Sequence, residues 1–270
     1  MTTVTRWSGG ATLETRPPQK QRRQGKRLKS RGFFISFEGI DGTGKSTQFR
    51  RLVRTLRRQG YTVCATREPG GTPVGEKVRA ILLADQENLS ALTELALFYA
   101  ARAQHLEDVI RPALDRGEVV VSDRFNDCSF AYQGSGRGLG FRTVRQIDRV
   151  ICGPTQPDLA LVLDLDPHLA LERAGARDRR QGSQSNRFEA AGLDFQRHTR
   201  LGYLALARRE PERVRLINAG RPRGEVEAEI RRVVQERLAE RSQAEISRSR
   251  KTGSRKPGPK AGLSVEKPAR

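Results

Sequence analysis

The stretch FISFEGIDGTGKSTQ, residues 34 to 48, decides how this chain folds. It contains the pattern G-x-x-x-x-G-K-[ST] in full, from Gly39 to Ser46, with an apolar run before it and a segment of helical spacing after it. Glycines in this pattern let the backbone wrap around a phosphate group, and the start of the following helix adds a positive end. We therefore expect a strand, a phosphate-binding loop and a helix in this order.

The loop also predicts a site for a nucleoside triphosphate and Mg²⁺. Lys45 is expected to neutralise the β and γ phosphates, and the Ser46 hydroxyl to bind the metal ion. The residues predicted to hold the nucleotide are Gly39, Ile40, Asp41, Gly42, Thr43, Gly44, Lys45, Ser46 and Thr47. GTPases, helicases, transporters and small-molecule kinases share this loop, so the loop alone leaves the reaction open.

Five short apolar runs alternate with helical segments along the chain. The runs are 33–37, 61–66, 119–122, 159–165 and 214–218, and the helical segments are 45–59, 74–84, 90–116, 141–152, 167–175, 192–209 and 223–241. Apolar runs of this kind are typical of strands buried on both faces of a parallel sheet. We predict an α/β, three-layer fold of the P-loop NTPase type, a five-stranded parallel sheet with helices on both faces, and ligands beyond the carboxyl ends of the strands.

Composition divides the chain into one domain and two basic tails. Residues 1–32 carry nine Lys or Arg and one acid, and residues 240–270 carry nine and three, so the tails hold +8 and +6 of the formal net charge of +20. Neither tail has enough large apolar side chains to offset the entropy of ordering it. We predict a disordered basic extension over 1–32, a folded domain over 33–240 and a disordered basic tail over 241–270.

The tails leave a second class of function open, because basic runs attract nucleic acid. The simpler interpretation is that they are solvated. The sequence shows no apolar run of membrane-spanning length and no secretory signal, so no membrane contact is expected. Three widely spaced cysteines, with no C-x-x-C pair, indicate a reducing compartment. We expect a cytoplasmic protein; the Arg-rich, acid-poor N-terminus leaves an organellar location as the alternative.

Charged and aromatic residues follow the predicted strands or share a helix face. The turn Arg67-Glu68-Pro69-Gly70-Gly71-Thr72 can aim an arginine at an anion, and Asp123-Arg124 ends the third strand. Phe98 and Arg102 stand at i and i+4, so a ring could stack on a base while a guanidinium donates to its carbonyl. Each feature alone also fits a structural role, as a turn, an ion pair, or a core ring with a surface charge.

Together these motifs resemble the thymidylate kinase family. REPGGT (67–72), LFYAAR (97–102), SDRF (122–125), AYQGSGRG (131–138) and QPDLALVLDLDP (156–167) occur in the family's order. The resemblance spans about residues 33 to 219. It implies a nucleoside monophosphate kinase that transfers the γ-phosphoryl group of ATP to dTMP, giving dTDP for dTTP synthesis. It also implies a homodimer formed through helices of the middle region.

The resemblance implies roles for the residues of the acceptor site. Asp41 and Arg67 match positions near the acceptor's sugar and phosphate. Phe98 matches the ring that stacks on thymine, and Arg102 the group that reaches its O4. Asp123-Arg124 match the family's Asp-Arg motif, in which Arg124 holds the acceptor phosphate close to the transferred group.

Three more residues match the acceptor side. Ser129 lies where a polar side chain contacts the base edge, and Tyr132 where a ring crowds the 2′ position and favours deoxyribose. Glu189 lies where it could orient the acceptor sugar or metal-bound waters.

The polar, glycine-punctuated segment 175–189 resembles the basic lid of bacterial family members. Phosphoryl transfer needs positive charge at the transferred group, and the loop has Gly42 where other members have an arginine. The segment carries four arginines: Arg177, Arg179, Arg180 and Arg187. We predict that one or more of them supplies this charge as the lid shuts and expels water.

Two other functions stay as alternatives at this stage. One is a kinase for another nucleoside monophosphate or for a nucleoside, against which the set Phe98, Arg102 and Ser129 counts because it suits a pyrimidine. The other is a nucleotide-dependent switch or nucleic-acid-binding module. The chain lacks an N-K-x-D motif for reading guanine, which counts against a GTPase switch.

Overall fold

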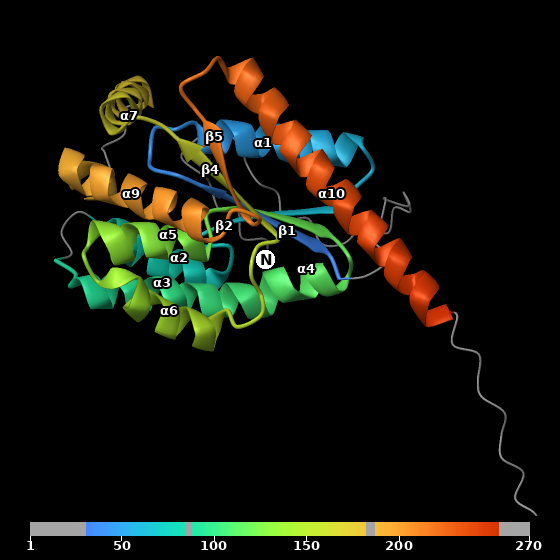
Figure 1. The fold of residues 1–270 in the computed structure, drawn as a ribbon. Helices are drawn as coiled ribbons and strands as arrows, with labels where there is room; N and C mark the ends of the chain where they lie inside the picture. Colours follow the sequence, from blue (N-terminus) through green and yellow to red (C-terminus); the bar gives the residue numbers. More distant parts are fainter. Residues whose placement is uncertain (1–30, 85–87, 182–186, 254–270) are drawn as a thin grey trace, which may run out of the picture.

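The computed structural model describes residues 31–84, 88–181 and 187–253 (Figure 1). Its strands are β1 (Phe33–Glu38), β2 (Val63–Arg67), β3 (Val119–Asp123), β4 (Leu159–Asp164) and β5 (Val214–Asn218). All neighbouring strands are parallel, in the order β2-β3-β1-β4-β5. The predicted five-stranded parallel sheet is confirmed.

Helices cover both faces of the sheet, as Figure 1 shows. One face carries α1 (Lys45–Arg58) and α10 (Arg223–Gly253). The other carries α2 (Pro73–Leu83), α3 (Ala91–His105), η1 (Leu106–Ile110), α4 (Arg111–Asp115), α5 (Asn126–Ser129), η2 (Phe130–Gly136), α6 (Gly140–Ile151) and α9 (Leu193–Arg209). The helices α7 (Pro167–Gln181) and α8 (Arg187–Ala190) follow β4. The predicted three layers are therefore present.

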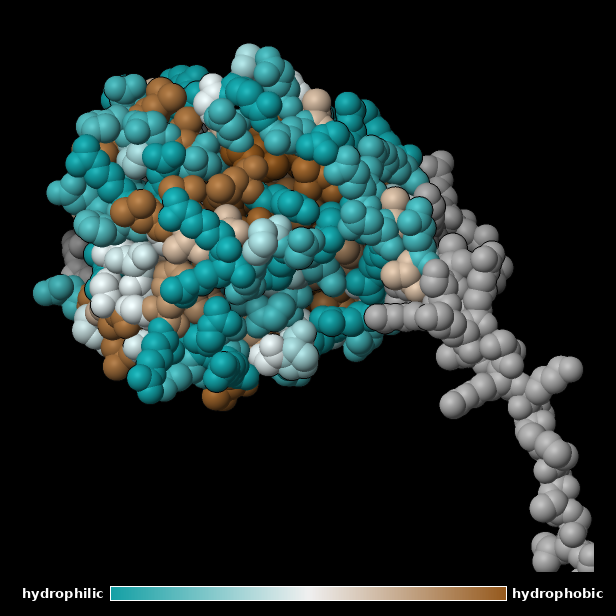
Figure 2. All heavy atoms as spheres, viewed as in Figure 1, coloured by the Kyte–Doolittle hydropathy of each residue, from teal (hydrophilic) through white to brown (hydrophobic). Residues whose placement is uncertain are grey.

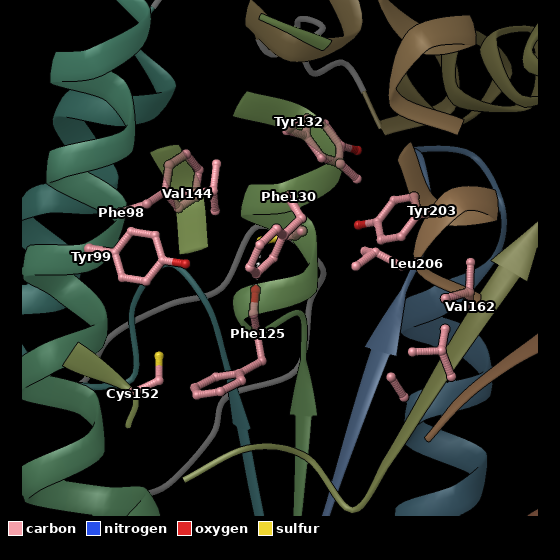
Figure 3. Packing of buried hydrophobic residues seen from close by; sticks show 14 of the residues in the cluster. Phe98, Tyr99, Phe125, Phe130, Tyr132, Val144, Cys152, Val162, Tyr203 and Leu206 are labelled. Atoms are coloured by element: carbon pink, nitrogen blue, oxygen red, sulfur yellow. Dashed lines mark hydrogen bonds between the residues drawn. The ribbon is translucent and has the colours of Figure 1, made fainter. Parts of the chain in front are cut away.

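The alternating side chains of β1 enter two separate cores. Ile35 and Phe37 pack with residues of α1 and α10, whereas Phe34 packs on the opposite face. There the ring of Phe34 meets that of Phe125, with centroids 4.8 Å apart. Figure 3 shows how the aromatic side chains of α3, η2 and α9 converge in this second core. Both faces of the central strand are buried, and its residues are apolar except Ser36 and the last one, Glu38. The outer surface, by contrast, is mostly hydrophilic in the view of Figure 2.

Two helical segments differ from the sequence prediction because of local chemistry. The helix expected over 90–116 is divided by the π-helical segment η1, which ends just before Arg111-Pro112. Pro112 has no backbone N–H to donate, so the regular hydrogen-bond pattern is interrupted there. The segment 126–136 was not predicted to be helical, since its glycines are typical of a loop. Burial of Phe130 and Tyr132 holds it in α5 and η2.

The C-terminal helix α10 runs to Gly253, so the predicted domain end at 240 falls inside a helix. Arg241 ties this part of α10 to the start of β1: its guanidinium donates to Asp158 Oδ1 at 3.3 Å and to the Arg31 carbonyl, and lies over the Phe33 ring. The rest of the predicted tail, 254–270, and residues 1–30 lie outside the described residues. None of the described helices combines the length and apolar character that a membrane crossing requires.

Replacing Arg241 by alanine is expected to lower the free energy of unfolding by about 0.5 to 1 kcal/mol, because the variant loses a partly buried ion pair. Arg232 offers a matched control on the same helix, since its ion pair with Glu236 is more exposed, 61% against 20% for the Arg241 side chain. Urea unfolding of both alanine variants measures the difference. Equal losses would show that Arg241 does not fasten α10 to the sheet.

Candidate active site

The carboxyl ends of β1 and β3 bring the phosphate-binding loop beside Asp123 and Arg124. The strands pair in register with Phe37 opposite Asp123, and the Arg124 N–H donates to the Phe37 carbonyl at 2.9 Å. The Ser46 hydroxyl, at the start of α1, donates to Asp123 Oδ2 at 3.2 Å. The sequence prediction that these residues meet at one edge of the sheet is therefore correct.

Lys45 is buried under the loop that it is predicted to serve. Its Nζ donates to the Ile40 carbonyl at 2.7 Å and lies 3.5 Å from Asp41 Oδ1. Burial and the nearby charge of Arg124 lower the pKa of Lys45 to about 8, although Asp41 acts in the opposite direction. A phosphate placed in the loop would stabilise the ammonium form, so nucleotide binding is expected to take up a proton near that pH.

Packing leaves no room for an arginine side chain at position 42 of the loop. Gly42 has a φ of +81°, and a Cβ atom at this position would lie 1.9 Å from the Ala170 carbonyl oxygen. A side chain would therefore collide with the backbone of α7 as well as strain its own. Positive charge for phosphoryl transfer must come from other elements.

Arg124 bridges the loop and the opposite wall of the site. Its guanidinium donates to the Gly39 carbonyl at 3.1 Å, to Asp41 Oδ1 at 2.6 Å and to the Tyr132 hydroxyl at 3.1 Å. Its backbone has a φ of +71°, in the left-handed region that non-glycine residues rarely adopt. Strained residues of this kind concentrate at functional sites.

Asp41 stays ionised beside these cations. Burial would raise the pKa of its carboxyl group, but the charges of Arg124, Lys45 and Arg177 together lower the pKa below its usual value. The carboxylate therefore balances part of the positive charge of the site when no nucleotide is present.

A cavity opens next to Asp41 and Arg124. Its lining comes from the loop after β1, the turns after β2 and β3, and the helices α2, α3, α5, η2 and α8. The residues are Asp41, Glu68, Pro69, Arg79, Leu83, Phe98, Arg124, Cys128, Tyr132, Gln133 and Phe188. Of the residues predicted to contact the acceptor, Asp41, Phe98, Arg124 and Tyr132 meet here. The rings of Phe98 and Tyr132 each face that of Phe188, with centroids 6.0 Å and 5.8 Å apart.

Arg102 and Ser129 lie behind this lining. The Arg102 side chain is 0% exposed: Nε donates to Glu68 Oε2 at 2.7 Å, Nη1 to Ser129 Oγ at 3.1 Å and Nη2 to the Phe125 carbonyl at 3.0 Å. The sequence placed Arg102 on the same helix face as Phe98 but did not show that Glu68 would hold its charge. The predicted contacts of Arg102 and Ser129 with the base edge remain predictions.

Arg67 is also held by a neighbour. Its Nη2 donates to both carboxylate oxygens of Glu76, at 2.9 Å and 2.8 Å, and it is not part of the cavity lining. The predicted contact of Arg67 with the acceptor's sugar and phosphate stays a prediction.

Several lining residues were missed by the sequence analysis, although two of them stand in quoted motifs. Glu68 and Gln133 belong to the quoted motifs REPGGT and AYQGSGRG but had been given no role. Arg79 carries no motif signal; it reaches the cavity because its Nη1 donates to the Pro69 carbonyl at 3.0 Å. Phe188 follows the predicted lid arginine Arg187 directly.

The four lid arginines lie in different surroundings. α7 continues to Gln181, so Arg177, Arg179 and Arg180 are helical, not part of a loop. Arg177 donates to Asp178 Oδ1, and its charge reaches Asp41. Arg180 donates to the Ala176 carbonyl on an exposed face. Residues 182–186 lie outside the described residues.

Arg187 belongs to the acceptor side. Its guanidinium donates to Glu94 Oε2, and Glu94 is fully buried and also accepts a hydrogen bond from Gln133 at 2.7 Å. The predicted role of Arg187 in transition-state charge stays a prediction. The Glu189 side chain lies outside what the structure describes.

Substituting Arg102 with alanine is expected to destabilise the fold by about 3 to 5 kcal/mol, because it leaves the buried Glu68 carboxylate without its cation. Arg67→Ala, which breaks the more exposed pair with Glu76, should cost about 1 kcal/mol or less. Denaturant unfolding separates the two cases. Loss of dTMP turnover in an Arg102→Ala variant of unchanged stability would instead indicate direct base recognition.

Comparisons with known proteins identify the family of this chain. The family model described as thymidylate kinase matches residues 37–230. A thymidylate kinase of Deinococcus radiodurans is 48% identical over 208 residues, which cover 77% of this chain and 98% of that protein. One from Pseudomonas syringae pv. tomato is also 48% identical, over 77% of this chain and 97% of its own length. The crystal structure of thymidylate kinase from Ehrlichia chaffeensis is 31% identical, with a TM-score of 0.62 over 76% of this chain and 98% of that chain. This chain belongs to the thymidylate kinase family.

Proposed function

We propose that this chain binds ATP at the loop 39–47 and dTMP in the adjacent cavity, and transfers the γ-phosphoryl group to give dTDP. Membership of the family makes the chain a dTMP kinase. The observation that supports this use of the site is the position of Arg124. Its one guanidinium contacts the loop at Gly39 and Asp41 and the cavity wall at Tyr132.

Transfer then depends on position and charge more than on covalent chemistry. We infer that Lys45 binds the β and γ phosphates and that Arg124 turns from Asp41 to the acceptor phosphate. Replacement of a carboxylate by a phosphate as the partner of Arg124 costs little, because the guanidinium keeps an anion beside it throughout. The donor and acceptor phosphates are thus brought together at the edge where β1 and β3 end.

The acceptor nucleoside is recognised by shape and stacking. The Phe98 ring lines the cavity and is available to stack on thymine, and Tyr132 closes it near the position of the deoxyribose. Glu68, a polar group of the lining, binds Arg102, which in turn donates to Ser129, and Gln133 adds a second polar group that donates to Glu94. We infer that thymine binds against this side.

The donor site suits Mg²⁺. The Ser46 hydroxyl, oriented by Asp123, offers an oxygen ligand of the kind that Mg²⁺ prefers. In the described part of the chain, no group of three or more His, Cys, Asp or Glu side chains could hold a metal ion. This composition fits a metal ion that is held mainly by nucleotide phosphates and that, when bound, would neutralise their charge.

A substrate panel tests the proposed function. Purified protein with Mg²⁺ and ATP should phosphorylate dTMP far better than AMP, GMP or CMP. Discrimination against dUMP should be weaker, since one methyl group in an apolar pocket is worth about 1 to 3 kcal/mol. Turnover of AMP at the rate of dTMP would contradict the proposal.

Among the lid arginines we propose Arg177 as the main source of transition-state charge, because its charge already acts on Asp41 in the loop. Arg177→Ala should lower kcat by about 100-fold or more with a smaller change in the dTMP Kd. Arg180→Ala, on the exposed face of the same helix, should have the smaller effect. Steady-state kinetics measures the loss of kcat in each variant. A larger loss in Arg180→Ala than in Arg177→Ala would assign the role to Arg180.

We also infer a cytoplasmic homodimer. Large hydrophobic side chains are exposed on four helices on one side of the sheet: Val74 and Ile81 on α2, Leu92 on α3, Val150 on α6 and Leu201 on α9. Apolar side chains exposed on helices of one layer are available to a subunit interface. A light-scattering mass of a single chain would contradict the dimer.

The three cysteines are all free, which suits a reducing compartment.

A further inference from the structure

Glu38, the last residue of β1, is buried directly behind the site. Its side chain is 0% exposed and does not line the acceptor cavity. The two groups that contact its carboxyl oxygens carry no charge. The backbone N–H of Phe125 donates to Oε1 at 2.9 Å, and the Tyr203 hydroxyl of α9 lies 3.0 Å from Oε2. Figure 3 shows Tyr203 reaching inward from α9, toward the segment that carries Phe125 and Tyr132.

The charges around Glu38 come from several elements. Asp127 of α5 faces it and is held by Arg213, which makes two bonds to the carboxylate, at 2.7 Å and 2.8 Å. The charges of Arg124, directly after β3, and of Lys45, in α1, interact with the Glu38 carboxyl group from the side of the loop. The Cys128 thiol of α5 also interacts with it. Burial, and then the charge of Asp127, raise the pKa of Glu38 to about 8 against the opposing charge of Arg124. A pKa in this range favours the protonated acid at neutral pH.

The N–H that Glu38 binds belongs to the turn that presents Arg124. Three hydrogen bonds fix this turn: the Arg124 N–H donates to the Phe37 carbonyl, the Ser122 hydroxyl to the Arg124 carbonyl at 2.6 Å, and the Phe125 N–H to Glu38. The left-handed φ of Arg124 is costly for a residue with a side chain, so these bonds are needed to maintain it.

We propose that Glu38 is a positioning residue that acts as a neutral carboxylic acid: its Oε1 accepts the Phe125 N–H, its Oε2 shares a hydrogen bond with the Tyr203 hydroxyl, and together these contacts hold the turn that aims Arg124 at the acceptor phosphate. The proposal rests on the proposed function of Arg124. A neutral acid can bind the backbone without competing with phosphate for the nearby guanidinium. An ionised Glu38 would attract that guanidinium and repel Asp127, and so would weaken the acceptor site.

The kinetic test compares wild type, Glu38→Gln and Glu38→Ala from pH 6 to pH 9.5, with ATP and dTMP saturating so that bound phosphates keep Lys45 charged. Wild-type kcat should fall as the pH rises through about 8, and Glu38→Gln should lack this fall because its amide cannot ionise. At pH 7 the glutamine variant should keep kcat within about threefold of wild type, whereas Glu38→Ala should lose about tenfold or more. The exposed Glu212→Gln is the matched control and should keep the wild-type profile.

A stability test is independent of turnover and covers the case in which the alanine variant fails to fold. Folded Glu38 keeps its proton up to about pH 8, whereas the unfolded chain loses it near its ordinary pKa of 4.5. Wild type therefore loses stability over this range relative to Glu38→Gln. The Tm of the glutamine variant minus that of wild type should increase from pH 5 to pH 8, with no such trend for Glu212→Gln.

Two results would overturn the proposal. A glutamine variant with the wild-type pH profile, or with a Tm difference that does not change with pH, would show that Glu38 is not protonated. Loss of most activity in Glu38→Gln at pH 7 would show that the site needs a charged Glu38. Failure of the wild-type protein to phosphorylate dTMP would contradict the proposed function, and the Tm comparison would still report the charge state of Glu38.

Discussion

The ion pair between Arg124 and Asp41, at 2.6 Å, is the interaction on which this site depends. Asp41 belongs to the loop after β1 and Arg124 to the end of β3, so the pair joins the predicted donor site to the acceptor cavity. Parallel pairing of the two strands fixes their distance. The left-handed backbone of Arg124 then turns its guanidinium back over the loop. Without this turn, no side chain would connect the phosphate-binding loop to the aromatic cavity.

A second constraint explains where positive charge is found around the loop. The backbone of α7 lies so close to Gly42 that the loop has no room for a side chain there. The same helix carries Arg177, whose charge reaches Asp41. Arg177 of α7 thus adds positive charge next to the loop, where position 42 itself has no room for a side chain. Arg187, by contrast, is bound to Glu94 beside the acceptor cavity, so the arginines of one sequence segment serve different sides of the site.

The sequence allowed the sheet, the loop and the meeting of Asp41, Ser46, Asp123 and Arg124 to be predicted, because strand ends in a parallel sheet fix the positions of the residues that follow them. It did not predict features that depend on partners distant in the chain. Arg102 is turned inward by Glu68, 34 positions before it, and Glu38 is buried by Tyr203, 165 positions after it. The glycine-rich segment 131–138 resembles a loop, yet burial of Phe130 and Tyr132 keeps most of it helical.

The central claim is that Arg124 exchanges the Asp41 carboxylate for the phosphate of dTMP when the acceptor binds. A crystal structure of the protein with dTMP and ADP tests it most directly. The account predicts the dTMP phosphate within hydrogen-bond distance of the Arg124 guanidinium, the thymine ring stacked on Phe98, and the left-handed turn at Arg124 unchanged. A dTMP molecule bound away from this cavity, or bound in it with Arg124 still paired to Asp41 and not to the phosphate, would contradict the account.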